Sequence, residues 1–297
     1  MRNKLTTTLI TSLSNSSRVI ALSLLLALSG TYTVPCSAAT LSTRPNEFSW
    51  LPLFCDHQIR QVKLSADIQK LKDYDVVVII DKSRSMLVED CQADLKAKAL
   101  PISRWQWCRR QTLDIARQAL GVLPQHFRVV TFANDWSVYD NVDPAGVDMI
   151  FGENTPSGPT KAAEVLRNQI DDYFARRAQQ GENAKPLLVA MITDGCPDNP
   201  SAFKYAITHA TSMMSDPDEV KISLLQVGHD ERATKLIADL QGLVQHGAKY
   251  DIVRTQTFDQ VQQAGLVRSL ADAVAPTAAK ADSDRSQLTA SAEHRPF

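Results

Sequence analysis

At 297 residues the chain has room for one α/β domain of about 200 residues with tails, or for two smaller domains. Its 44% apolar and 22% charged residues are ordinary globular values, which excludes a fibrous or wholly disordered protein. Thirty-two Lys and Arg balance thirty-three Asp and Glu, so no strong field draws the molecule to nucleic acid or to an anionic membrane. We therefore expect no nucleic-acid partner.

Residues 1–39 have the composition of a signal peptide. Basic residues precede an apolar run over residues 19–28, and the small residues that follow at 36–39 suit signal peptidase. The apolar run is shorter than the roughly 20 residues of a membrane span. We expect cleavage after Ala38 or Ala39 and a periplasmic or secreted mature protein. The alternative is an uncleaved N-terminal anchor, which would be the route to membrane association.

Four cysteines remain once such a peptide is removed, and they are Cys55, Cys91, Cys108 and Cys196. An even number in an exported chain favours disulfides over free thiols. The sequence leaves three pairings open. We favour Cys91 with Cys108, because they bracket one insertion, and this leaves Cys55 for Cys196. Closing the loop between Cys91 and Cys108 would contribute about 3 kcal/mol. Buried, unpaired thiols are the alternative.

The first predicted strand and the first predicted helix are separated by an insertion. Residues 40–72 are mixed in character and predict a lead-in segment. Residues 75–81 form a continuous apolar run that ends in a carboxylate, which indicates a central strand buried on both faces. Residues 86–108 then predict an insertion. After it, residues 112–123 carry apolar side chains at helical spacing and residues 127–132 form another buried-type strand.

The rest of the chain continues this alternation of strands and helices. We expect further strands at 136–142, 187–193, 221–228 and 250–253, and helices at 161–179, 201–214, 232–243 and 258–275. Strands that alternate with helices of this length imply right-handed crossovers in a doubly wound, mostly parallel sheet with helices on both faces. The domain would span residues 73–275. Residues 276–297 have no apolar period and predict a flexible tail.

Oxygen-bearing side chains follow two of the predicted strands. Asp81, Ser83 and Ser85 alternate directly after the first strand, Asp194 ends a later one, and Thr160 begins a helix. In such sheets the site lies beyond the carboxyl ends of the strands. Carboxylates and hydroxyls without thiol or imidazole suit Mg²⁺, or else Mn²⁺ or Ca²⁺. Two carboxylates and three hydroxyls also leave a coordination position for a carboxylate from outside.

A strand ending in Asp-x-Ser-x-Ser, a later loop threonine and a strand ending in Thr-Asp-Gly together resemble the metal-ion-dependent adhesion site of the von Willebrand factor A family. The resemblance covers roughly residues 73–275 and implies one antiparallel edge strand, at residues 136–142. It implies that hydroxyls hold the ion and that the carboxylates bind it directly or through water, the residues being Ser83, Ser85, Thr160, Asp81 and Asp194. In the family, a Glu or Asp of the ligand completes the coordination sphere.

Two features depart from the family pattern. Pro159 precedes Thr160 where the family has a Gly-rich loop, and Thr155 is close enough to be a rival ligand. The insertion stands beside the metal loop, where the family passes directly into its first helix, so we expect it to shape or cover the site. Its Trp105 and Trp107 are expected to be packing residues rather than binding anchors.

Three function hypotheses follow. The leading one is an extracytoplasmic binding module, not an enzyme, that grips an acidic residue of a partner protein for adhesion, scaffolding or assembly. The alternative is a metal-dependent phosphohydrolase with Asp81 as nucleophile, but such enzymes generally need a second acid where this chain has Ser83. The sequence also has no Gly-x-Ser-x-Gly elbow and no phosphate-cradling loop. The third hypothesis is a structural domain with a degenerate metal site.

Overall fold

The computed structural model describes residues 66–92, 100–123, 127–240 and 242–275. The predicted signal peptide, most of the lead-in segment, Cys55 and the predicted tail lie outside the described residues. Within the described residues, six strands form one sheet in the order β3-β2-β1-β4-β5-β6. The strands are β1 Asp75–Asp81, β2 Phe127–Phe132, β3 Trp136–Val142, β4 Leu187–Thr193, β5 Val220–Gln226 and β6 Val253–Gln256.

Most helices lie in the connections between these strands, and the last two follow β6. The α-helices are α2 Arg104–Ala119, α3 Pro144–Glu153, α4 Ala162–Gln180, α5 Pro200–Met213, α6 Glu231–Leu240, α7 Phe258–Ala264 and α8 Leu266–Ala273. The short 3₁₀ helices are η1 Arg84–Leu87, η2 Gly181–Asn183 and η3 Leu243–His246. Among the described residues, no helix combines the length and the apolar character needed to cross a bilayer.

The sheet is doubly wound. β1 pairs in parallel with both β2 and β4, while β3 pairs antiparallel with β2 at the edge. The chain therefore builds outward from β1 on one side and returns to place β4 on its other side. This arrangement confirms the predicted fold class and the predicted antiparallel strand at residues 136–142. The reversal of strand order falls between β1 and β4, where sites in such sheets occur.

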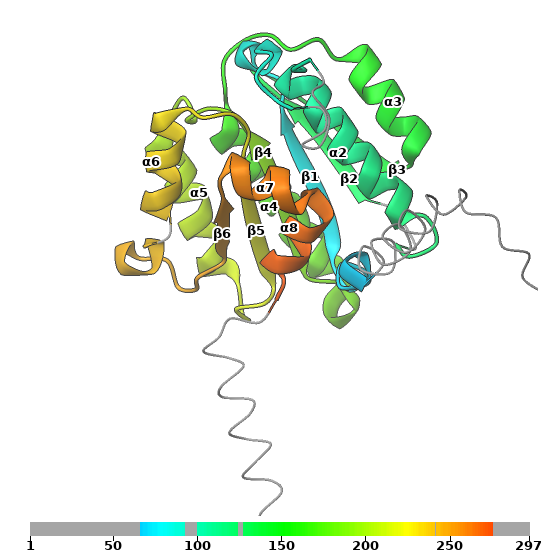
Figure 1. Cartoon of the computed structure of the whole chain (residues 1–297). Helices are drawn as coiled ribbons and strands as arrows, with labels where there is room; N and C mark the ends of the chain where they lie inside the picture. Colours follow the sequence, from blue (N-terminus) through cyan, green and yellow to red (C-terminus); the bar gives the residue numbers. More distant parts are fainter. Residues whose placement is uncertain (1–65, 93–99, 124–126, 241, 276–297) are drawn as a thin grey trace, which may run out of the picture. The chain divides into compact units, whose positions relative to one another are not determined.

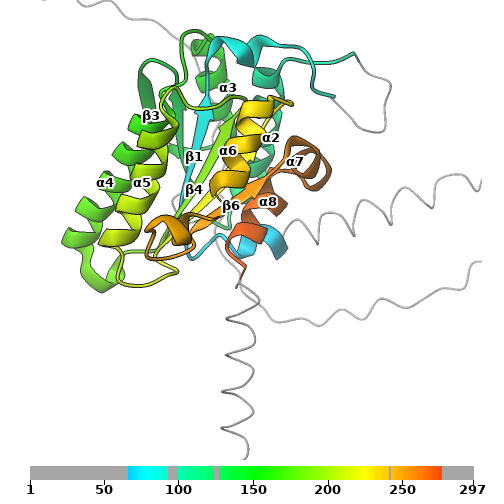
Figure 2. The ribbon, with the colours of Figure 1, turned by 90° about the vertical axis from the view of Figure 1, so that its left-hand side faces the viewer.

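Helices cover both faces of the sheet (Figure 1). α4 and α5 stand on one side, and α2, α7 and α8 stand on the other (Figure 2). Because successive side chains of a strand point to opposite faces, β1 contributes Val76, Val78 and Ile80 to one core cluster and Val77 and Ile79 to the other. Burial on both faces holds β1 rigidly, which makes the loop after it a well-defined platform.

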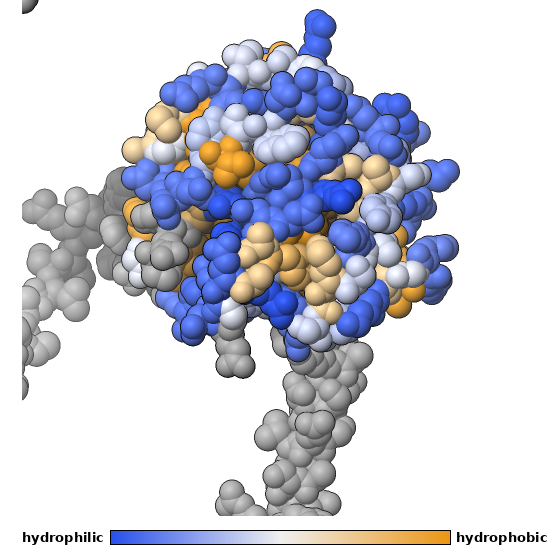
Figure 3. Space-filling view, turned by 180° about the vertical axis from the view of Figure 1, so that it is seen from behind, coloured by the Kyte–Doolittle hydropathy of each residue, from blue (hydrophilic) through white to orange (hydrophobic). Residues whose placement is uncertain are grey.

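The outer surface of the α4 and α5 layer is polar. Seen from behind, this face is mostly hydrophilic, and its apolar residues lie in separate small areas (Figure 3). The amphipathic character of α4 agrees with this view, because its buried residues include Val165, Leu166 and Ile170 while Glu164 and Arg167 are exposed. The helices on this face therefore bury their apolar stripes against the sheet.

Several predicted element bounds are wrong. α2 begins at Arg104, inside the predicted insertion, because the Ser103 hydroxyl caps it by accepting a hydrogen bond from Gln106 N at 3.1 Å. The irregular part of the insertion therefore ends at Ser103 rather than at Cys108. α3 was not predicted, although Asp143 caps it and a proline occupies its first turn. β6 begins at Val253, where the predicted strand ended.

The predicted helix over residues 258–275 is two helices separated at Gly265. This glycine has φ +80, a conformation that residues with a Cβ adopt at a cost. Its backbone N–H donates to Val261 O at 2.8 Å and ends α7, after which α8 begins in a new direction. The break lets both short helices pack against the sheet, with Val261 and Leu270 in the same core cluster.

We predict that Gly265→Ala lowers the free energy of unfolding by about 1 kcal/mol or more, because alanine is strained at positive φ. The nearest atom to an added Cβ is Gln111 Oε1 at 4.0 Å, so the cost is conformational rather than steric. Urea unfolding monitored by circular dichroism measures the change. Gly152→Ala in α3 is the matched control: no atom lies within 4 Å of its Cβ position, and we expect a gain of about 0.5–1 kcal/mol. Equal effects of both variants would contradict the assignment.

Candidate metal centre

Asp81 is the fixed point of the site. It is the last residue of β1, and it is fully buried. Its Oδ1 accepts a hydrogen bond from Ser83 N at 2.7 Å, and its Oδ2 accepts one from Thr193 Oγ1 at 2.7 Å. Because β1 and β4 are neighbouring parallel strands, their carboxyl ends bring Asp81 and Thr193 together. The carboxylate is therefore held by the loop after its own strand and by the end of β4.

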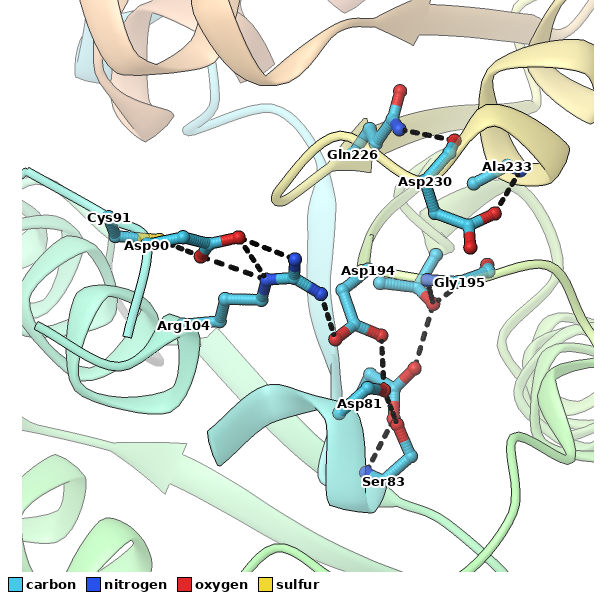
Figure 4. A network of polar contacts seen from close by, with 12 residues as sticks. Asp81, Ser83, Asp90, Cys91, Arg104, Asp194, Gly195, Gln226, Asp230 and Ala233 are labelled. Carbon is cyan, nitrogen blue, oxygen red and sulfur yellow. Dashed lines mark hydrogen bonds and ion pairs between the residues drawn. The ribbon is translucent and has the colours of Figure 1, made fainter. Parts of the chain in front are cut away.

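Two serines and a second carboxylate extend this arrangement. Ser83 Oγ lies 3.1 Å from Ser85 Oγ, and Ser85 Oγ donates a hydrogen bond to Asp194 Oδ1 at 2.9 Å. The Asp194 side chain is fully buried. Figure 4 shows Asp81 and Asp194 on neighbouring segments with Ser83 below them. The structure thus brings together four of the five residues predicted from the sequence: Asp81, Ser83, Ser85 and Asp194.

Thr160 lines the same cleft as Ser85 and Asp194, and this cleft has a volume of about 700 Å³. Thr160 is 9% exposed, whereas the rival Thr155 is exposed at the surface. The backbone of Thr160 is anchored to Asp198, whose N–H donates to Thr160 O at 3.1 Å. The geometry therefore favours Thr160 over Thr155 as the threonine of the site.

The loop before Thr160 is fastened to the loop after β1. Ser157 N donates to Lys82 O at 2.7 Å, and Arg84 N donates to Gly158 O at 3.3 Å. Gly158 has φ +84, so the chain turns here in a conformation that favours glycine. Pro159 therefore does not prevent the approach, because the glycine before it supplies the turn. These backbone contacts hold the two loops against each other beside the cleft.

Burial and a like charge act on Asp81. Burial and, second, the negative charge of Asp194 raise the pKa of its carboxyl from 3.8 to about 7, while hydrogen bonds from Ser83 and Thr193 act in the opposite direction. Two carboxylates this close and this deeply buried repel each other when both are ionised. A cation bound between them would relieve that repulsion.

The donor set fits a hard divalent cation. Its oxygens come from carboxylates and hydroxyls, which are ligands of Mg²⁺, Mn²⁺ and Ca²⁺. Within the part of the chain that the structure describes, no group of three or more His, Cys, Asp and Glu side chains is placed to hold a metal ion. The candidate set rests on its own oxygen donors, and the residues that would hold the ion are Ser83, Ser85, Thr160, Asp81 and Asp194.

Arg104 belongs to the site, and sequence reasoning missed it. Its Nη1 donates to Asp194 Oδ2 at 2.8 Å, and its Nε donates to Asp90 Oδ1 at 3.0 Å. The arginine is the first residue of α2, and its side chain is 13% exposed. Gly228, with φ +76, leaves room for the guanidinium, because a Cβ there would lie 2.5 Å from Arg104 Cζ. In the sequence, the Ser103 cap signal would have placed Arg104 at a helix start, but not beside Asp194.

The predicted Cys91–Cys108 disulfide is not formed in the structure. Both residues are free, fully buried thiols, and Cys196 is a free thiol that is partly buried. Cys91 and Cys108 are part of the same core cluster, where the side chain of a free cysteine packs as a small apolar group. Burial raises the pKa of the Cys91 thiol to about 12, which keeps it protonated and unreactive. The predicted partner of Cys196, Cys55, lies outside the described residues.

The tryptophans of the insertion are packing residues, as expected. Trp105 and Trp107 are buried at the start of α2. Trp105 packs on Phe151 of α3 with ring centroids 4.3 Å apart, and Trp107 meets Phe258 of α7 edge-on at 5.5 Å. They fix the start of α2, and with it Arg104, against the neighbouring helices.

No family model and no curated protein matches the chain. Solved structures with a similar backbone trace include proximal thread matrix protein 1 of the mussel byssus. The two chains are 17% identical with a TM-score of 0.42, and the match covers 68% of this chain and 46% of that one. The VWA domain of SpRpn10 has 11% identity and a TM-score of 0.44, over 68% and 98%. The manganese-loaded TRAP protein of Plasmodium vivax has 10% identity and a TM-score of 0.42, over 65% and 71%.

A second structure of the mussel protein is described as having a zinc-occupied MIDAS motif, and it has 19% identity and a TM-score of 0.38. This chain spans less than half of the mussel protein. Likeness at this level concerns the fold, and the case for a metal site rests on the geometry of this chain. The doubly wound sheet with its antiparallel edge strand is the fold that the resemblance of the motifs to the von Willebrand factor A family implied.

The raised pKa of Asp81 predicts an unusual pH dependence in chelator. Between about pH 4 and pH 7 the unfolded chain carries Asp81 ionised while the folded chain carries it protonated. The folded state then binds more protons, so this group's contribution to the free energy of unfolding falls as the pH rises and levels off above about 7. Urea unfolding in chelator across this range measures the slope.

The variant Asp81→Asn provides the control, because its side chain does not titrate. The difference in unfolding free energy between wild type and Asp81→Asn should change across this pH range. A constant difference would contradict the raised pKa.

Proposed function

We propose that the chain is an extracytoplasmic protein-binding module that binds a carboxylate of its partner through a divalent cation. The observation that carries this proposal is the convergence of four predicted ligands from two neighbouring strand ends, namely Asp81, Ser83, Ser85 and Asp194. Two of them, Ser85 and Asp194, line one cleft. Thr160, in the wall of the same cleft, supplies the fifth. Mg²⁺ is the ion we propose first, with Mn²⁺ and Ca²⁺ as alternatives of the same ligand chemistry.

The cleft supports an acidic ligand from outside. Ser85, Thr160 and Asp194 line a volume of about 700 Å³, which is enough for a side chain of a partner. The protein offers two carboxylates and three hydroxyls, and a hard cation with these ligands has positions left to fill. A carboxylate is the protein group that adds both an oxygen ligand and a negative charge. An Asp or Glu of a partner protein therefore suits the site better than a neutral side chain.

The position of Asp81 supports binding rather than phosphoryl transfer. A nucleophilic carboxylate must reach the substrate, but Asp81 is fully buried and each of its oxygens accepts a hydrogen bond. Two residues further on, Ser83 offers no acid group for proton transfer. We propose that the chain is not an enzyme, and that adhesion, scaffolding or assembly is its use.

Export of the chain is part of the proposal. It is supported by the basic, apolar and small-residue order of residues 1–39, which is typical of a cleaved signal peptide. Mass spectrometry of the mature protein would find its N-terminus after Ala38 or Ala39. A mature protein that begins at Met1 and is found in the cytoplasm would contradict export.

We predict that Ser83→Ala weakens Mg²⁺ binding at least about tenfold, because it removes a hydroxyl ligand at the centre of the donor set. The fold should survive, since one buried hydrogen-bonding group is typically worth about 1 kcal/mol. Isothermal titration calorimetry with MgCl₂ measures the affinity, and circular dichroism checks the fold. Ser212→Ala is the control, since this serine is exposed on α5 and its hydroxyl donates to His209 O.

The partner is tested by affinity capture with the mature protein in Mg²⁺ and in chelator. Wild type should retain a partner in Mg²⁺ alone, and Ser83→Ala should retain none under either condition. Capture that is equal in chelator would contradict a metal-bridged contact. Phosphoester turnover by wild type that is lost in Asp81→Asn would favour the enzyme alternative, and absence of Mg²⁺, Mn²⁺ and Ca²⁺ binding by wild type would favour a degenerate site.

A further inference from the structure

Arg104 places a positive charge directly on one of the proposed metal ligands. Its Nη1 donates to Asp194 Oδ2 at 2.8 Å, while Asp194 Oδ1 accepts from Ser85 Oγ. The Asp194 side chain is fully buried, and that of Arg104 is 13% exposed. This ion pair is therefore shielded from solvent. Charges interact more strongly in such a buried position than at an exposed surface.

The place of Arg104 is built into the fold. On its other side, the guanidinium contacts Asp90: its Nε donates hydrogen bonds to both carboxylate oxygens, at 3.0 and 3.1 Å. Gly228 packs against it without a side chain, and any Cβ there would overlap the guanidinium. Arg104 thus lies between two carboxylates: Asp90, in the insertion, and Asp194, directly after β4 (Figure 4).

The charges of the site explain the effect of these two ion pairs of Arg104. Asp81 and Asp194 repel each other, which contributes to the raised pKa of Asp81. Arg104 supplies one positive charge to Asp194 from within the protein, so Asp194 remains balanced when the site holds no ion. A divalent ion at the same carboxylates meets repulsion from the guanidinium at short range. Arg104 and the ion would therefore both balance the charge of the Asp194 carboxylate, and their positive charges would repel each other.

We propose that Arg104 is a positioning residue that acts as an internal counter-cation for Asp194, and that it lowers the affinity of the site for a divalent ion. This inference rests on the proposed metal site and concerns its regulation. Arg104 keeps Asp194 in place in the metal-free protein, and its charge weakens binding of the ion. Coupling between two sites is reciprocal, so the ion also weakens the ion pair between Arg104 and Asp194. Through Arg104, it weakens the link from Asp194 to Asp90 in the insertion.

The test compares wild type with Arg104→Gln in chelator and in saturating MgCl₂. In chelator, we expect the variant to melt at a lower temperature, because Asp194 loses its counter-charge. In Mg²⁺, the ion replaces that charge, so the Mg²⁺-induced rise in melting temperature should be larger in the variant than in wild type. Titration calorimetry with MgCl₂ alone should show affinity about tenfold tighter for the variant, because the repulsion is gone.

Two further variants separate charge from structure. Arg104→Lys keeps the positive charge, so its Mg²⁺ affinity should stay near that of wild type. Arg128→Gln is the matched control. Arg128 also joins two carboxylates, Asp140 and Asp172, and is 17% exposed, but it pairs with Val77 near the opposite end of the strands from Asp81. Its loss should lower the melting temperature without changing Mg²⁺ affinity.

The outcomes distinguish this inference from the proposed function. If wild type binds Mg²⁺ and Arg104→Gln binds it equally or more weakly, the counter-cation role is overturned while the metal site stands. Binding by the variant alone would support the inference in its strongest form, with Arg104 excluding the ion from the wild-type site. If neither protein binds an ion, both the metal site and the role of Arg104 are overturned.

Discussion

The site depends on the burial of two carboxylates beside each other. Asp81 and Asp194 lie at the carboxyl ends of β1 and β4, and both side chains are removed from solvent. Burying ionised groups is costly unless charges or hydrogen bonds compensate. The surroundings provide hydrogen bonds from Ser83, Ser85 and Thr193, and one positive charge from Arg104. A cation-binding role gives a reason for a fold to carry this arrangement.

The sheet order makes this proximity unavoidable. β1 and β4 are far apart in sequence, yet they are neighbours in the sheet because the chain returns across β1 after forming β2 and β3. Their parallel register brings Asp81 beside the end of β4, where Thr193 and Asp194 follow. Burial on both faces leaves β1 little freedom, so the core sets the position of Asp81 at the strand end, and hydrogen bonds from Ser83 N and Thr193 Oγ1 then hold its carboxylate.

The sequence predicted the parts of the site that depend on periodicity and on strand ends. Apolar runs that stop at Asp81 and just before Asp194 indicated both strands, and doubly wound topology placed their ends together. The start of α2 was missed because the apolar pattern becomes regular only after Thr112, whereas the helix is set by the Ser103 cap. The break at Gly265 was missed because apolar spacing continues through it, and a positive φ has no periodic signal.

The cysteines and Arg104 show a different limit, since both depend on contacts between distant segments. An even count of cysteines favoured pairing, but Cys91 and Cys108 are free thiols in the core that surrounds the start of α2. That same packing, with Trp105 against Phe151, directs Arg104 toward Asp194. The insertion was expected to shape or cover the site. What it supplies is a charge, because the helix begins early enough to bring Arg104 to Asp194, one of the candidate metal ligands.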